Sequence, residues 1–146
     1  MKKRVLIIDD EVFFRTILSK LVSVAGYNYH IADSGEKGYE LVLKNHYDCI
    51  FVDYQMYELN GIEFVKLIRS NPDPAIAEVP IVLLTGCVQK EIVDAAYEAG
   101  ISLFRQKLEL KQTAECIDSI MNEAISNNEL HLVNNSLMFL FKGFWD

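Results

Sequence analysis

The sequence predicts a single α/β domain built around a parallel β-sheet. Short, wholly apolar runs, typical of strands that are buried on both faces, recur along the chain. Amphipathic stretches of about 10 to 15 residues separate these runs, and this alternation is typical of repeated βαβ units. The chain has 146 residues, 51% of them hydrophobic, which is enough to bury one core.

The first half of the chain alternates expected strands with helices. The strands are expected at 4–8, 27–32 and 47–52, and the helices at 12–25 and 35–45. Apolar residues in the first helix recur every three or four positions, and Gly26 follows its end as a C-cap. Ser34 is suited to cap the second helix. The run at 27–32 is less apolar than the others and therefore suits a sheet edge.

The second half continues the same alternation. Helices are expected at 61–70, 89–99 and 110–127, and strands at 81–84 and 101–104. The segment Asn71-Pro72-Asp73-Pro74 ends the first of these helices, and Gly100 closes the second. The run at 81–84 is the most apolar, which favours a central place in the sheet.

Acidic residues directly follow two of the expected strands. Asp9, Asp10 and Glu11 come after the first strand, and Asp53 comes after the third. The carboxyl ends of parallel strands lie on one edge of a sheet, so these carboxylates are expected to converge. Like charges about 4 Å apart repel by roughly 4 kcal/mol at an effective dielectric constant of about 20. The pattern therefore predicts a cation site at this edge.

Two further polar residues are expected on the same edge. Thr85 follows the fourth strand, and Lys107 follows the fifth. Carboxylates with water suit magnesium, while a hydroxyl and an ammonium group suit phosphoryl oxygens. Asp53 stands alone at its strand end, so it is the best candidate for a nucleophile that forms an aspartyl phosphate. Phosphorylation there would draw Thr85 toward the new group and bias a two-state surface.

These residues resemble the receiver domains of bacterial two-component response regulators, particularly the stand-alone, chemotaxis-regulator-like ones. The resemblance covers about residues 3–127. It rests on residue type and spacing in four motifs: Asp9-Asp10-Glu11; Asp53 with Met56 and Gly61; Thr85 with Gly86; and Gly100 with Phe104 and Lys107. It implies a flavodoxin-like, doubly wound five-stranded parallel sheet in the order 2-1-3-4-5, with helices on both faces. The receiver domain is expected over 1–127.

The resemblance also implies the chemistry at the acidic cluster. Asp53 would accept a phosphoryl group from a histidine kinase or a histidine phosphotransfer protein. Magnesium would be held by Asp10, Asp53 and the backbone carbonyl of Gln55. Asp9 would act through water or by orienting its neighbours.

The remaining implied roles concern the phosphoryl group and the switch. Thr85 and Lys107 would bind the phosphoryl group, and Lys107 would pair with Asp53 before activation. Phe104 occupies the aromatic switch position. Leu108 and Tyr57 stand where most receivers have proline. A cis bond before a non-proline residue costs about 2.5–4 kcal/mol, so the loop at Leu108 is either trans and differently shaped, or strained.

The expected function is thus a phosphorylation-controlled signalling switch that catalyses only its own phosphorylation and dephosphorylation. A phosphorylation-independent pseudo-receiver scaffold is the alternative, supported by Leu108 and Tyr57. A magnesium-dependent phosphatase with an aspartyl nucleophile would place a second Asp at position 55, where this chain has Gln55. We hypothesise that Gln55 and Cys87 set the lifetime of the phosphoryl group.

The tail at 128–146 is apolar and exceeds what a receiver needs. Leu137, Leu140, Phe141, Phe144 and Trp145 fall on one helical stripe. Strands at 129–133 and 137–141 around Asn134-Asn135-Ser136 would instead make a hairpin. Such a segment could pack on its own domain, form a homodimer or dock on a partner.

Composition excludes several other functions. A net charge of −7 argues against binding to nucleic acid, which requires a basic face. No apolar run approaches the roughly 18 residues of a membrane span, and the apolar run after the basic start is too short for an export signal. The three scattered cysteines lack metal-ligand spacing. We therefore expect a cytoplasmic protein that signals by protein contact.

Overall fold

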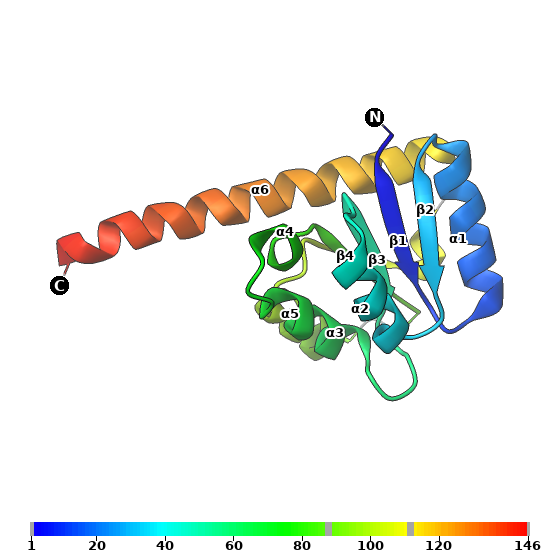
Figure 1. Ribbon diagram of the computed structural model, residues 1–146, viewed down its shortest axis with the longest axis horizontal. Helices are drawn as coiled ribbons and strands as arrows, with labels where there is room; N and C mark the ends of the chain where they lie inside the picture. Colours follow the sequence, from blue (N-terminus) through cyan, green and yellow to red (C-terminus); the bar gives the residue numbers. More distant parts are fainter. Residues whose placement is uncertain (1, 87–88, 111–112, 146) are drawn as a thin grey trace.

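The computed structural model describes residues 2–86, 89–110 and 113–145. Five strands form one sheet in the order β2-β1-β3-β4-β5, and every neighbouring pair is parallel. The strands are β1 (Arg4–Ile8), β2 (Asn28–Ala32), β3 (Cys49–Asp53), β4 (Ile81–Thr85) and β5 (Leu103–Gln106). The predicted fold class and strand order are confirmed. Figure 1 shows strands β1 to β4 with the helices around them.

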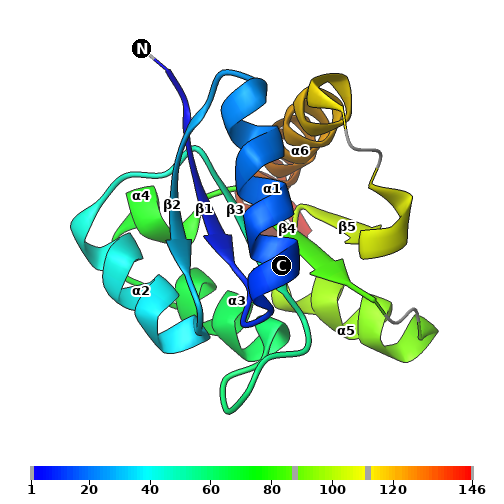
Figure 2. The same cartoon turned by 90° about the vertical axis from the view of Figure 1, so that its right-hand side faces the viewer.

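Helices cover both faces of the sheet. They are α1 (Val12–Val24), α2 (Gly35–Lys44), α3 (Gly61–Arg69), α4 (Pro74–Ala77), α5 (Lys90–Ala99) and α6 (Ala114–Trp145), with a 3₁₀ turn η1 (Lys107–Glu109). Figure 2 shows α1 and α6 on one face, and α2, α3 and α5 on the other. Alternate strand residues serve the two layers: Val5 and Ile7 pack with α1 and α6, whereas Leu6 and Ile8 pack with α2 and α3.

Polar caps and a left-handed glycine fix several helix ends. The Ser34 hydroxyl accepts a hydrogen bond from the backbone N–H of Lys37 at the start of α2. Asn60 and Glu63 form a reciprocal capping box at the start of α3. Gly100 ends α5 with φ of 111°, a backbone conformation that favours glycine. The Ser34 and Asn60 caps fix loops at the carboxyl edge of the sheet, whereas Gly100 fixes the turn into β5 at the opposite edge.

The structure differs from the sequence prediction mainly in the last third. Strand β5 lies two residues later than expected, and a short helix, α4, follows the Asp73 N-cap. Helix α6 begins at Ala114 and runs unbroken to Trp145, instead of ending near residue 127. The hairpin alternative for the tail is therefore wrong. Its expected turn at 134–136 lacks the glycine that favours a tight hairpin turn, so the chain keeps its helical hydrogen bonds.

Helix α6 extends well beyond the sheet. Figure 1 shows it crossing the domain and continuing into solvent toward the C-terminus. It has 32 residues. Across the described ranges, neither α6 nor another helix combines the length and hydrophobicity needed to cross a membrane.

Candidate functional site

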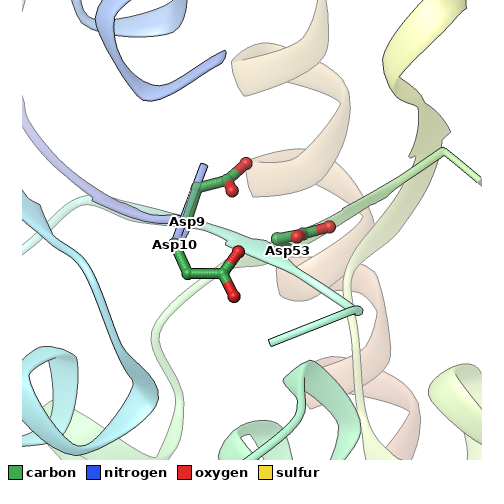
Figure 3. A group of neighbouring side chains, drawn as sticks. All are labelled: Asp9, Asp10 and Asp53. Carbon is green, nitrogen blue, oxygen red and sulfur yellow. The ribbon is translucent and has the colours of Figure 1, made fainter. Parts of the chain in front are cut away.

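Three carboxylates meet at the carboxyl edge of the sheet. Asp9 and Asp10 directly follow β1, and Asp53 is the last residue of β3, its neighbour in the sheet. One oxygen from each carboxylate lies within 4.8 Å of the others (Figure 3). Asp9 and Asp53 are only 2% and 4% exposed, whereas Asp10 is exposed. The cluster is therefore buried on one side and open to water on the other.

Lys107 reaches into this cluster from the start of η1. Its Nζ lies 2.8 Å from Oδ2 of Asp9, and 3.5 Å from both Oδ2 of Asp53 and Oε2 of Glu11. The ammonium group also sits 4.4 Å from the ring centroid of Phe14, a cation–π distance. Lys107 thus contacts Asp53, but its shortest ion pair is with Asp9.

Burial controls the charges in the site. Burial, reinforced by the charge of Asp9, raises the pKa of Asp53 to about 7, against an opposing effect of Lys107. Burial likewise raises the pKa of Asp9. Burial disfavours the charge on Lys107, yet its hydrogen bond to Asp9 and the charges of Asp53 and Glu11 outweigh this, and the pKa of Lys107 is raised. The crowded carboxylates would be relieved by a further cation.

The donor set suits a small, hard divalent cation. Magnesium binds one or two carboxylates and keeps several water ligands. Asp10 and Asp53 supply two carboxylates, and the exposure of Asp10 leaves the outer side of the cluster accessible to water. The residues present therefore fit the magnesium site that the sequence implies.

Thr85 and Phe104 lie on the two strands beyond Asp53. Thr85 ends β4, which pairs with β3, and its side chain is fully buried. Phe104, in β5, is half-buried against the core layer of α3 and α5, and its backbone N–H donates a hydrogen bond of 3.3 Å to Oη of Tyr97. Gln55 is exposed two residues after Asp53. Cys87 lies outside the described residues.

Gly61 allows the start of α3 to pack against the end of β3. Its N–H donates a hydrogen bond of 2.9 Å to the carbonyl of Tyr54. A Cβ at Gly61 would lie 2.5 Å from the backbone oxygen of Asp53 and 2.8 Å from Cδ1 of Leu83. This close approach explains why glycine stands eight residues after Asp53.

The loop after Lys107 contains no proline and takes the trans form. The described residues contain no cis peptide bond, and Lys107 instead begins the single 3₁₀ turn of η1. Leu108 is 90% exposed at that turn. Of the alternatives that the sequence left open, the peptide bond between Lys107 and Leu108 is therefore trans.

Sequence reasoning missed two contacts of the site. Glu11 was part of the acidic motif but had no assigned partner, and no contact of Phe14 with Lys107 was predicted. Their positions one turn apart on the start of α1 were the available signal, because residues three apart lie on the same helix face.

The comparison with protein families matches this geometry. The model described as "Response regulator receiver domain" matches residues 5–115. The chain belongs to this receiver family. Receiver domains are signalling switches of two-component systems and not conventional enzymes. No other family is needed to account for the fold or for the acidic edge.

Curated relatives are much longer than this chain. A gliding motility regulatory protein of Myxococcus xanthus is 32% identical over 119 residues, covering 80% of this chain and 15% of the relative. The sensory/regulatory protein RpfC of Xanthomonas campestris is 28% identical over 127 residues, covering 87% of this chain and 17% of the relative. The chain thus corresponds to one portion of these proteins.

Solved structures share the fold. The chemotaxis protein CheY4 of Vibrio cholerae superposes with a TM-score of 0.77 at 24% identity, covering 85% of this chain and 99% of that one. A fusion that carries a trimeric coiled-coil segment of yeast Spc42 gives a TM-score of 0.75 at 22% identity, covering 99% of this chain and 97% of that one.

Proposed function

We propose that this receiver is a phosphorylation-controlled switch that accepts a phosphoryl group on Asp53 from a histidine kinase or a histidine phosphotransfer protein. The observation that carries the proposal is the convergence of three carboxylates and Lys107 at one sheet edge. A buried carboxylate among like charges is a group whose protonation state is adjusted by its surroundings, as functional carboxyls often are.

In the transfer step, a carboxylate oxygen of Asp53 attacks the phosphorus of a phosphohistidine. An O–P bond forms, the P–N bond of the donor breaks, and the departing imidazole takes up a proton. When bound at Asp10, Asp53 and the Gln55 carbonyl, magnesium would supply positive charge that offsets the charge on the transferring group. Lys107 favours the ionised form of Asp53, which is the nucleophilic form.

After transfer, the phosphoryl oxygens require new donors. Lys107 already lies between Asp9 and Asp53, so a short movement of its flexible side chain would bring the ammonium to the phosphoryl group. The Thr85 hydroxyl, on the adjacent strand, is the second proposed donor. Movement of Thr85 would be transmitted to Phe104, and the surface around β5 and α5 would signal by protein contact.

The direct test is phosphorylation with a small donor. Purified chain is incubated with magnesium and acetyl phosphate, and its intact mass is recorded beside Asp53→Asn and the control Asp94→Asn, an exposed acid on α5. We expect the mass of one added phosphoryl group in the parent and the control only, and none without magnesium. If acetyl phosphate does not phosphorylate the parent and beryllofluoride does not bind to it in the presence of magnesium, the pseudo-receiver scaffold replaces the switch.

A further inference from the structure

In the described part of the chain, the segment of α6 after Asn128 is largely exposed, although Leu130 and Asn134 at its start still border a hollow beside Tyr97 and Ile101. Up to Asn128 the helix packs on the sheet through Ile117, Ile120, Met121 and Ala124, all buried. The described side chains from Glu129 onward are exposed, apart from half-buried Leu132. At about 1.5 Å per residue, the segment 129–145 reaches roughly 25 Å. Figure 1 shows it projecting from the domain.

The projecting segment carries an apolar seam with heptad spacing. Leu130, Val133, Leu137 and Leu140 are separated by three, four and three residues, and Phe144 continues the series in sequence. Their side chains, as far as Leu140, are 61%, 54%, 45% and 68% exposed. This alternation of three and four is the spacing of the residues that face a partner helix in a coiled coil. Toward the C-terminal end the apolar surface widens in sequence, because Met138, Phe139 and Phe141 lie beside the series.

The charge around the seam is compatible with pairing to a second copy. Positions that flank it, such as Asn134 and Ser136, are uncharged, and the only fully charged side chains at 129–145 are Glu129 and Lys142, of opposite sign. A second copy therefore brings no repeated like charge against the seam, although the chain as a whole carries −7. Because an isologous contact places the same patch on both sides, identical apolar layers can meet their own equivalents.

A buried polar clamp fixes the direction in which the helix leaves the domain. The Asn128 amide donates a hydrogen bond of 2.7 Å to the carbonyl of Glu78, and its oxygen accepts one of 3.3 Å from the Ser102 hydroxyl. The Asn127 amide donates a bond of 3.0 Å to the Ser102 carbonyl. The Ser102 hydroxyl also accepts a bond of 3.0 Å from the N–H of Ile81. The exposed segment is thus a continuation of an anchored helix.

The clamp lies at the opposite edge of the sheet from the acidic cluster. Ile81 begins β4 and Ser102 precedes β5, whereas Asp53 and Thr85 end their strands. We propose that the segment Glu129–Trp145 pairs with the same segment of a second copy of this chain. The two paired segments form a coiled coil, here called the stem, which joins two receivers whatever the phosphorylation state of Asp53.

The first test is the mass of the full-length chain in solution, measured by sedimentation equilibrium. We expect twice the chain mass of 16.7 kDa. Leu137→Lys places a charge on the seam and should weaken association at least about tenfold. Met138→Lys, its neighbour off the seam and 73% exposed, should leave association unchanged. Far-ultraviolet circular dichroism establishes that both variants remain folded.

Two results would overturn the pairing. One is a parent chain that stays monomeric at about 100 µM, a concentration at which even weak specific dimers form. The other is an equal weakening of association by Leu137→Lys and Met138→Lys, because only Leu137 lies on the proposed seam.

A second measurement tests independence from the acidic cluster. The dissociation constant of the parent should change less than about twofold on addition of magnesium and beryllofluoride, and a change above about tenfold would contradict a permanent stem. The pairing test requires no phosphorylation, so a failure of the proposed switch would leave it unaffected.

Discussion

Lys107 offsets the repulsion among the carboxylates of the acidic edge when no metal is bound. It contacts two buried carboxylates and the exposed Glu11, while Phe14 covers its ammonium group. Breaking a buried ion pair by removing one partner leaves an uncompensated charge, which is costly. In the metal-free protein, Lys107 offsets the negative charge of these carboxylates. The free energy of unfolding should therefore depend on pH and on cation concentration.

Protonation of Asp53 should make the metal-free protein more stable at low pH. Its pKa is about 7 when folded against an ordinary value of 3.8, so the folded state binds the proton more tightly. This contribution is complete below pH 4 and is lost as the pH rises toward 7. Asp53→Asn removes this contribution to the pH dependence of stability. At pH 8, in EDTA, urea unfolding should show the variant more stable by on the order of 2 kcal/mol.

The advantage of Asp53→Asn should shrink as the pH falls toward 4.5, where the parent carboxyl is largely protonated. A difference between the two proteins that stays constant over this range would show that burial of the Asp53 charge is not its source.

Magnesium should stabilise the folded chain through the same carboxylates. A ligand that binds only the folded state stabilises it by RT ln(1 + [L]/Kd), about 1.4 kcal/mol at ten times Kd. We expect millimolar magnesium to raise the melting temperature by a few degrees. Asp10→Asn should abolish the shift, and Asp94→Asn should retain it. An equal shift in both variants would indicate general ionic stabilisation.

The convergence of Asp9, Asp10 and Asp53 could be predicted because parallel strands deliver their ends to one edge. The partner choice of Lys107 could not. A lysine side chain is long and flexible, so its nearest carboxylate depends on the backbone of η1, which residue spacing along the chain does not specify.

At the scale of elements, continuous apolar runs in the sequence predicted the strands well, but the sequence pattern predicted the end of helix α6 poorly. β1, β3 and β4 are buried on both faces, so their side chains form unbroken apolar runs. The end of α6 was misplaced because solvent exposure does not itself stop a helix. No glycine or proline interrupts α6 before Gly143.

The junction between β3 and α3 should be intolerant of a single methyl group. Gly61→Ala would place Cβ against the backbone of Asp53, and overpacking of this kind typically costs about 1–3 kcal/mol. Gly86→Ala is the matched control, since among the described residues a Cβ there meets nothing within 4 Å. Urea unfolding should show a lower free energy of unfolding for Gly61→Ala and no change for Gly86→Ala. Equal stability of the two variants would mean that α3 can shift freely.

At the scale of the molecule, the acidic cluster and the point where the projecting helix leaves the domain lie at opposite edges of the sheet. The acidic cluster lies where the strands end, and the Ser102–Asn128 clamp lies where β4 and β5 begin. The core is complete by Asn128. Removal of the projecting helix should therefore leave the receiver folded.

A chain that ends at Asn128 should unfold at a temperature independent of its concentration. The full chain, by contrast, should melt at a higher temperature as concentration rises, because association stabilises the folded state by mass action. Differential scanning calorimetry over about a hundredfold range of concentration makes the comparison. A melting temperature of the full chain that does not change with concentration would argue against self-association. A short chain that is unfolded would show that the receiver needs the projecting helix.

The unbroken course of α6 has a further geometric consequence. Each residue of an α-helix turns the next by about 100°. Only Glu129 separates the clamp at Asn128 from Leu130, the first seam residue. The number of residues between the clamp and the seam therefore fixes the direction, about the helix axis, in which the seam faces relative to the acidic edge. Inserting one residue there would swing each receiver around the stem by about a quarter turn without altering either surface.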